Sequence, residues 1–171
     1  MLNIFTLDNG RLVKIQPEEI AIRKPIWVDA TAPGEDEREW VAKTFSITLP
    51  QPEHLRDIEA SARFYEESDE LHVRSDFLLG KESDSRSVIV AFVLSNNVLF
   101  SVHDEDLPVF QRYRLHSHGQ TDPVADSHDV LIDLYGSDVE FSADALEETY
   151  ADLGGISGKV LSNALSDKQA G

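Results

Sequence analysis

Residues 88–94 read Val-Ile-Val-Ala-Phe-Val-Leu, and residues 98–102 read Val-Leu-Phe-Ser-Val after the turn Ser95-Asn96-Asn97. A strand with one face in water alternates apolar and polar side chains, so an unbroken apolar run is typical of a strand that is covered on both faces. Helices on each side of a sheet would provide that cover. These two stretches therefore predict an α/β fold, namely an α/β/α sandwich with a mixed β-sheet between helical layers.

The residues before this pair predict five more strands. Residues 3–7 and 11–15 are short β-type runs on either side of Asp8-Asn9-Gly10, where Asn-Gly suits the positive φ angles of a type I′ hairpin turn. Residues 26–30 have the composition of a buried strand, and two strands are expected between 63 and 79. The predicted sheet is complete at residue 102.

Helices are expected in four places. One helix begins in an acidic first turn and covers residues 35–45, and a short helix that a proline initiates covers residues 53–60. The pattern is helical again over residues 107–118 and after residue 127. These segments supply the layers that the apolar strands require.

The last helix has an apolar seam with steps of four, three, four and three residues. Its members are Val139, Ala143, Leu146, Tyr150 and Leu153. This spacing predicts a helix that packs lengthwise on another helix, and the partner need not lie in this chain. Gly154, Gly155 and Gly158 each cost about 1 kcal/mol relative to alanine inside a helix, so the helix is expected to end or bend there.

Length and composition indicate one domain that spans residues 1–171. Hydrophobic residues make up 41% and charged residues 27%, which is ordinary globular usage, and no second domain boundary is visible. Cysteine is absent, which excludes thiolate metal sites and agrees with a reducing compartment. The longest apolar run is far below the roughly 20 residues that span a bilayer, and no basic signal segment opens the chain, so a cytosolic location is expected.

The charge balance is strongly acidic and limits the possible partners. Fifteen Lys and Arg residues stand against 32 Asp and Glu residues, which gives a formal net charge of −17. A field of that sign repels phosphate backbones and anionic lipid headgroups while it concentrates cations. Nucleic acid is therefore excluded as a partner, and a bound metal is expected on oxygen or imidazole ligands.

Motifs for catalysis are absent or incomplete. No P-loop, Rossmann fingerprint, zinc-protease helix or EF-hand loop is present, and residues 155–158 fall one residue short of a nucleophile elbow. A Ser-His-Asp triad would rest on composition alone. His116 and His118 lie two apart, so on a helix they would point away from each other, and we interpret them as solvated loop histidines.

Acidic residues offer a better basis for metal chemistry. Glu53 and Asp57 lie four apart on one face of the short helix, where like charges cost roughly 0.2 to 0.5 kcal/mol unless a cation intervenes. Together with the net charge, this pair suggests binding of a hard cation such as Mg²⁺ or Ca²⁺, although a solvated helix face is the simpler alternative. Residues 104–106, Asp-Glu-Asp, are interpreted as acids that favour a helix N-terminus.

Several stretches resemble one transporter family. Residues 26–33, Ile-Trp-Val-Asp-Ala-Thr-Ala-Pro, followed by Glu35, Glu37 and Arg38, resemble the opening motif of the CorA family of magnesium transporters. Residues 55–64, Leu-Arg-Asp-Ile-Glu-Ala-Ser-Ala-Arg-Phe, resemble the Leu-Glu-Asp-Ile stretch of its enterobacterial-type branch. Residues 99–104, Leu107-Pro108 and residues 130–134 also fit in order, so the resemblance covers nearly the whole chain.

The resemblance implies a domain of a larger protein. Members of the family have an N-terminal cytoplasmic α/β/α domain, then a stalk helix, two membrane helices and a Gly-Met-Asn signature at the pore mouth. The only methionine here is Met1, so we expect the stalk and membrane segments to be absent from this chain. The implied protein is not an enzyme. It is a regulatory domain on the cytoplasmic face of the inner membrane, in a homopentamer that contacts the membrane only through the missing C-terminal segments.

The resemblance also implies metal ligands. Asp57 matches a family aspartate that binds a sensing cation together with an acid on the stalk helix of a neighbouring subunit, and that cation favours the closed state. Asp133 corresponds to a further acid near the start of the first long helix after the sheet. Arg56 replaces the family glutamate before Asp57, which disfavours an adjoining site. Because the stalk partner is missing, the isolated domain is expected to bind Mg²⁺ weakly if at all.

The sequence leaves the ion and two alternative functions open. The transported and regulatory ion implied by the family is Mg²⁺, with cobalt as a further candidate. The nearest alternative is the sensor domain of a related zinc transporter. A third alternative is a stand-alone acidic α/β protein with a hydrolase or interaction role.

Overall fold

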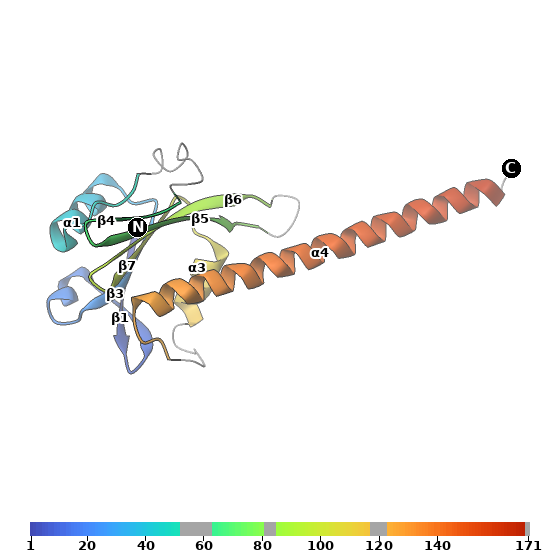
Figure 1. Cartoon of the computed structure of the whole chain (residues 1–171). Helices are drawn as coiled ribbons and strands as arrows, with labels where there is room; N and C mark the ends of the chain where they lie inside the picture. Colours follow the sequence, from blue (N-terminus) through green and yellow to red (C-terminus); the bar gives the residue numbers. More distant parts are fainter. Residues whose placement is uncertain (52–62, 81–84, 117–122, 170–171) are drawn as a thin grey trace.

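The computed structural model describes residues 1–51, 63–80, 85–116 and 123–169 (Figure 1). Its strands are β1 (Leu2–Asp8), β2 (Arg11–Ile15), β3 (Pro25–Thr31), β4 (Phe64–Glu67), β5 (Glu70–Leu78), β6 (Ser87–Ser95) and β7 (Val98–His103). Its helices are the 3-10 helix η1 (Pro17–Ala21) and the α-helices α1 (Glu35–Phe45), α3 (Pro108–His116) and α4 (Ser127–Gln169). All seven strands agree with the sequence predictions, and β4 and β5 lie between 63 and 79 as expected.

All seven strands form one sheet in the order β2-β1-β3-β7-β6-β5-β4. β3 and β7 run parallel at its centre, and the other neighbouring pairs are antiparallel, so the sheet is mixed as predicted. In the parallel pair, Asp29 lies opposite Ser101 and Thr31 lies opposite His103. Polar residues from two distant segments therefore meet at the C-terminal end of these strands.

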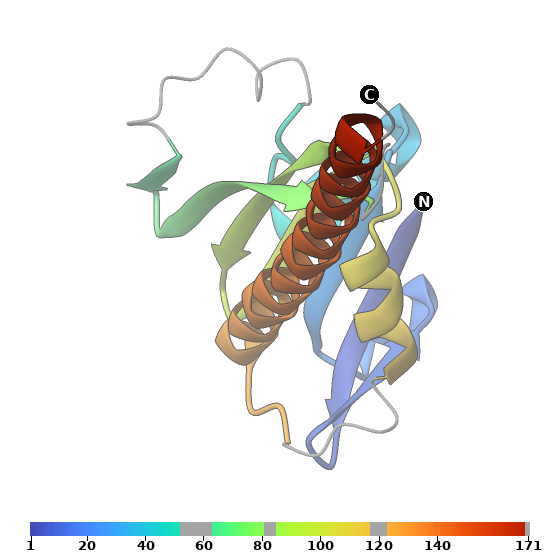
Figure 2. The same cartoon turned by 90° about the vertical axis from the view of Figure 1, so that its right-hand side faces the viewer.

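Helices cover both faces of the sheet. On one face, α3 and the first part of α4 pack over a core that includes Trp27, Phe77 and Phe92 (Figure 2). On the other face, α1 packs over a core that includes Val28 and Phe100. Successive residues of β6 contribute to the two cores in turn, which explains why that strand is apolar at every position. The α/β/α sandwich is thus confirmed.

The first hairpin fixes the entry to α4. Asn9 and Gly10 have φ angles of 51° and 76°, as the type I′ turn requires. The backbone N–H of Val124 donates to the carbonyl oxygen of Gly10 at 2.9 Å. A Cβ atom added to Gly10 would lie 2.8 Å from Cβ of Pro123, so a side chain at this position would collide with the segment that precedes α4.

α4 is a single helix of 43 residues, which the sequence did not predict. The prediction that it ends or bends at Gly154 and Gly155 is wrong, because the helix continues through both to Gln169. A glycine costs about 1 kcal/mol, but a helix that is already nucleated adds a hydrogen bond for each further residue. The first turns of α4 are nucleated by packing on the sheet, so propagation continues through the glycines.

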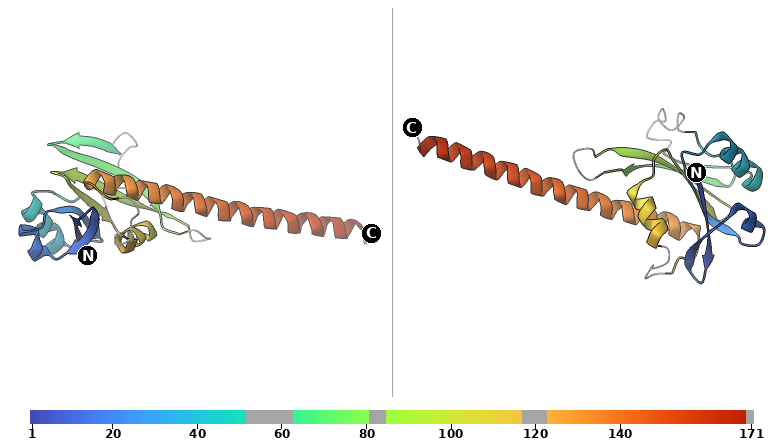
Figure 3. Two further views of the ribbon diagram at one scale, coloured as in Figure 1. Left: turned by 90° about the horizontal axis from the view of Figure 1, so that it is seen from below. Right: turned by 180° about the vertical axis from the view of Figure 1, so that it is seen from behind.

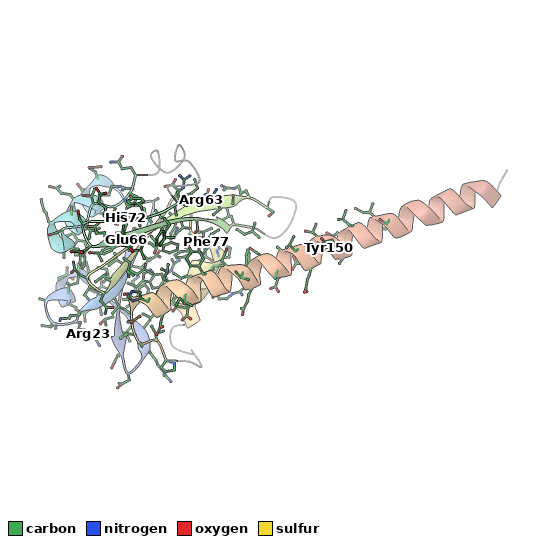
Figure 4. All side chains as sticks on the ribbon, viewed as in Figure 1. Arg23, Arg63, Glu66, His72, Phe77 and Tyr150 are labelled. Atoms are coloured by element: carbon green, nitrogen blue, oxygen red, sulfur yellow. The ribbon has the colours of Figure 1, made fainter. Side chains whose placement is uncertain are left out.

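The second half of α4 extends away from the α/β body (Figure 3). Buried positions end at Ala145, and every residue from Leu146 to Ser157 is exposed. In the predicted seam, Leu146 and Tyr150 are 60% and 73% exposed. Figure 4 shows Tyr150 on the part of α4 that extends beyond the α/β body. The apolar seam therefore has no cover within the described part of the chain.

Two predicted helices lie wholly or partly outside the described residues. The helix at 53–60 falls there entirely, and of the helix at 107–118 the structure describes α3, which ends at His116. Within the ranges that are described, no helix has both the length and the apolarity that a membrane span requires.

Candidate cation-binding residues and a buried polar network

Of the two predicted metal ligands, the structure describes one. Asp57 lies outside the described residues, together with Glu53. Asp133 lies in the second turn of α4 and is half-buried against α3. The hydroxyl of Tyr113, on α3, donates to Oδ2 of Asp133 at 2.9 Å. This contact fixes the carboxylate at the junction of the two helices that cover one face of the sheet.

Asp133 does not form a complete metal site. Among the described residues, no group of three or more His, Asp and Glu side chains is arranged to hold a metal ion. Mg²⁺ requires octahedral coordination and usually combines one or two carboxylates with several water molecules. Asp133 could supply one such oxygen, and any further protein ligand would have to come from another part of the chain or from another subunit.

A connected and largely buried polar cluster lies elsewhere, at the C-terminal end of β3 and β7. Asp29 is fully buried, and its Oδ1 accepts a hydrogen bond from Oγ of Ser101 at 2.8 Å. The same oxygen lies 2.9 Å from Nε2 of His103. Arg114 of α3 bonds to the other carboxylate oxygen of Asp29 and also to Asp106. The cluster thus ties the two central strands to α3.

The electrostatics of this cluster keep Asp29 ionised. Burial alone would raise the pKa of the Asp29 carboxyl, but the hydrogen bond from His103 and the charges of His103 and Arg114 lower it overall, with help from Ser101. Burial opposes the charge of Arg114, yet Asp29 and Asp106 raise the pKa of its guanidinium. Buried side chains stay charged only when they are paired with opposite charges and hydrogen-bonded, as these are.

Ser101, His103 and Asp29 are the residue types of a catalytic triad, but their arrangement differs from one. In a triad the histidine bonds to the serine and removes its proton. Here the carboxylate is central, and the Ser101 hydroxyl donates to Asp29 while it accepts from Nε1 of Trp27 at 3.0 Å. Ser101 is also fully buried. The cluster therefore does not activate Ser101 as a nucleophile.

Two of the three acids at residues 104–106 form ion pairs with arginine residues. Glu105 makes a two-pronged contact with Arg86, and Asp106 pairs with Arg114. They precede α3, which begins at Pro108, so their position just before a helix agrees with the prediction. His116 ends α3, and His118 lies outside the described residues, so the interpretation of this pair stays a prediction.

The described residues line two surface hollows. One, of about 530 Å³, is lined by the acidic β4–β5 turn, the β6–β7 turn and His128. In that hairpin, Tyr65 stacks on His72, which bonds to Glu70 at 3.0 Å. The other, of about 930 Å³, lies between α4 and the ends of β5 and β6, and Leu146 and Leu153 line it. The first hollow is acidic and the second is largely apolar.

The sequence contains a signal for this cluster, although no known motif marks it. A carboxylate within the apolar run 26–30 and a histidine at the end of the apolar run 98–102 are each unusual in a buried strand. Such residues are retained in a core only when partners satisfy them. What the sequence lacks is the register of the parallel strands, which sets Asp29 beside Ser101.

Comparison with known proteins identifies the relatives of the chain. Residues 23–170 match the family model described as CorA-like Mg²⁺ transporter protein. A magnesium transport protein CorA from Mannheimia succiniciproducens is 37% identical over 163 residues, which cover 94% of this chain and 52% of the relative. The protein of the same name from Haemophilus influenzae is 36% identical over 169 residues, which cover 98% and 53%. The chain thus spans about half the length of the curated relatives it matches.

Solved structures show the same fold at lower identity. The complete structure of the CorA magnesium transporter from Methanocaldococcus jannaschii matches with a TM-score of 0.75 at 17% identity, over 95% of this chain and 51% of that one. The soluble domain of CorA from the same organism matches with a TM-score of 0.70 at 16% identity, over 95% and 65%. These likenesses extend the agreement from the sequence to the architecture.

Proposed function

The chain belongs to the family of CorA-like Mg²⁺ transporters, and from this premise we propose that it forms the cytoplasmic regulatory domain of a divalent cation channel in the inner membrane. The proposal rests on the family match, which runs through the α/β body and along α4 to residue 170. The uncovered apolar seam on α4 supports it, because an exposed surface of this kind suits a domain that works inside a larger assembly.

In this proposal, Mg²⁺ has two roles: it passes through the channel, and it also regulates the channel. Each copy of the chain carries a net charge of −17, so neighbouring copies in a homopentamer repel one another until cations bind between them. If carboxylates from two subunits meet only in the closed state, Mg²⁺ binds that state better and shifts the population toward it. A site at ten times its dissociation constant contributes about 1.4 kcal/mol, so several interfaces must act together.

Two carboxylates are proposed as ligands, Asp57 and Asp133, and both are assigned by their place in the sequence of the family. The position of Asp133 is compatible with this role, because Tyr113 orients its carboxylate at the α3–α4 junction. Since the described residues offer no third ligand, the site would be completed across a subunit interface. The isolated chain should then bind Mg²⁺ weakly, and the assembled transporter should bind it firmly.

The test uses the full-length transporter in proteoliposomes. Mg²⁺ is titrated on the side of the regulatory domain while uptake is recorded for the wild type and for Asp57→Ala and Asp133→Asn. Both substitutions should move inhibition to higher Mg²⁺. Glu140→Gln, which removes the same charge from an exposed position of α4, should leave the titration unchanged. Unchanged inhibition in Asp57→Ala across the titration would show that this carboxylate does not sense the cation.

The same vesicles distinguish the ions. A magnesium transporter is expected to take up Mg²⁺, and Co²⁺ should compete with this uptake. A modest excess of Mg²⁺ should prevent inhibition of the uptake by Zn²⁺. Saturable Zn²⁺ uptake that Mg²⁺ does not inhibit would instead assign the domain to a zinc transporter. No transport of either ion by the full-length gene product would leave the stand-alone acidic protein as the better interpretation.

A further inference from the structure

We propose that the outer edge of β4 is a docking site for an extended segment of another protein that is rich in lysine or arginine and adds to the sheet as a further strand. β4 stands at one end of the strand order, and among the described residues its only neighbour in the sheet is β5 (Figure 2). Every residue of β4 is exposed. Such an edge is a template on which another chain can pair.

The register of β4 on β5 determines which backbone groups face outward. The backbone N–H of Arg74 donates to the carbonyl oxygen of Arg63 at 2.8 Å, so these two residues form a hydrogen-bonded pair of the antiparallel ladder. Hydrogen-bonded and non-hydrogen-bonded pairs alternate, and Phe64 and Glu66 therefore belong to non-hydrogen-bonded pairs. Their N–H and C=O groups point away from β5. These two residues thus present the donors and acceptors with which an added strand would pair.

This edge lacks the features that usually block a strand edge. Protected edges carry prolines, lysines or bulges, whereas residues 64–67 include neither proline nor lysine and pair with β5 without a bulge. Phe64 and Tyr65 are 60% and 42% exposed, which gives a partner aromatic surface to cover. β2, at the opposite end of the sheet, instead carries the cations Arg11 and Lys14. The two ends of the sheet therefore differ in protection and in charge.

The charge of the β4–β5 hairpin selects the partner. Its acidic residues are Glu66, Glu67, Asp69 and Glu70, and no Lys or Arg lies between residues 64 and 73. Burial raises the pKa of the Tyr65 hydroxyl, and the charges of Glu67 and Glu70 raise it further, so the negative potential extends over the exposed aromatic surface. Glu66 also lines the acidic hollow of about 530 Å³. A Lys or Arg side chain that the added strand places beside Glu66 would lie at this hollow.

A second copy of the chain is a poorer occupant of this edge. Pairing of two β4 strands would place like-charged glutamates against each other, which destabilises a sheet. Each copy also carries a net charge of −17, so any pairing between copies works against their mutual repulsion. A basic segment of another protein meets neither obstacle. None of the residues of this edge is a proposed Mg²⁺ ligand, so the inference does not depend on the proposed function.

The first test uses the 15N-labelled wild-type chain, and it therefore does not depend on whether a variant folds. The probe is the peptide Lys-Val-Lys-Val-Lys-Val-Lys-Val in about 0.15 M NaCl, and the control Lys-Pro-Lys-Pro-Lys-Pro-Lys-Pro has the same charge but cannot pair as a strand. In NMR spectra, the probe should slow amide exchange at Phe64 and Glu66 about tenfold and change little at Tyr65, whose N–H faces β5. Equal protection by both peptides, or protection by neither, would overturn the proposal.

The second test separates strand pairing from charge at Glu66. Glu66→Pro removes an outward N–H and no bond to β5, whereas Glu66→Gln removes the same charge and keeps the N–H. In calorimetric titrations with the lysine-valine peptide, Glu66→Pro should bind about tenfold more weakly than the wild type, and Glu66→Gln about two- to threefold more weakly. Equal affinities of the two variants would contradict strand addition. Self-association of the peptide-free wild type in sedimentation that Glu66→Pro abolishes would assign the edge to a second copy instead.

Discussion

Asp29 is the residue on which the buried network depends, since Ser101, His103 and Arg114 all bond to its carboxylate. We expect Asp29→Asn to lower the free energy of unfolding by about 3–5 kcal/mol, because it leaves buried positive charge without its anion and turns an amide N–H₂ toward donors. Urea denaturation at pH 7 measures the loss. Asp104→Asn, the same change at an exposed position close by, should cost less than 0.5 kcal/mol. A loss below 1 kcal/mol for Asp29→Asn would contradict this account.

The same carboxylate should govern part of the acid sensitivity. Although burial would raise its pKa, the partners of Asp29 lower the pKa overall. An unfolded aspartate titrates near pH 3.9, so the stabilisation from Asp29 is complete above that pH and is lost as the pH falls through the lower pKa of the folded state. The difference in unfolding free energy between the wild type and Asp29→Asn should therefore shrink below about pH 4. A difference that stays constant down to pH 3 would be inconsistent with a lowered pKa.

Single residues were the hardest part to predict. Asp57 and Asp133 were assigned from a family motif, and of these the structure describes Asp133 and adds its contact with Tyr113. The roles of Asp29 and His103 cannot be predicted from local sequence, because they depend on a contact between residues 74 positions apart. Periodicity predicts which strand is buried, but it does not determine which strand lies beside it. A polar residue in an apolar strand is the signal that should prompt a search for partners.

Among the elements, α4 shows how a helix is held at one end and free at the other. Tyr135 bonds to Ser75 of β5, and the backbone N–H of Leu78 donates to Oδ1 of Asp138 at 3.3 Å. Burial raises the pKa of Asp138 despite that bond, so its charge is only partly compensated. Beyond Ala145 no residue of α4 up to Ser157 is buried. The helix is thus anchored by its first five turns.

Glycine substitutions should separate the two kinds of glycine in the chain. A Cβ atom at Gly155 meets nothing within 4 Å, so Gly155→Ala should stabilise the distal helix by about 1 kcal/mol and slow amide exchange around it roughly fivefold. Gly10→Ala should instead destabilise the whole domain by about 1–2 kcal/mol, because φ is +76° and Pro123 blocks the added methyl group. Equal effects of the two substitutions would refute this distinction.

The elements themselves were largely predictable, for reasons that differ between strands and helices. Asn9-Gly10 encodes its turn locally, and β6 is apolar throughout because it contributes to two cores. The predicted end of α4 is wrong because the helix propensity of Gly154 and Gly155 does not stop a helix that is already nucleated before them. Local rules therefore identify where elements begin more reliably than where a long helix stops.

For the molecule as a whole, charge and exposed apolar surface act against each other. The seam of Val139, Leu146, Tyr150 and Leu153 favours association, since each of these side chains is more than half exposed. The net charge of −17 opposes association between copies. Cations that neutralise the charge would let the seam be covered. This balance connects the acidic composition to the proposed regulation, because neither property alone would make assembly depend on Mg²⁺.

The isolated chain should accordingly respond to MgCl₂ as it does to other salts. No group of three metal-binding side chains exists in its described residues, so Mg²⁺ should raise the Tm only by screening self-repulsion, within about 2 °C of NaCl at equal ionic strength. A specific site at ten times its dissociation constant would add about 1.4 kcal/mol, which for a chain of this length is roughly 3–6 °C. Thermal unfolding of the wild type and Asp133→Asn in both salts measures the difference. A specific rise with Mg²⁺ that Asp133→Asn abolishes would place the complete site within one subunit, and the proposal that subunit interfaces complete it would fail.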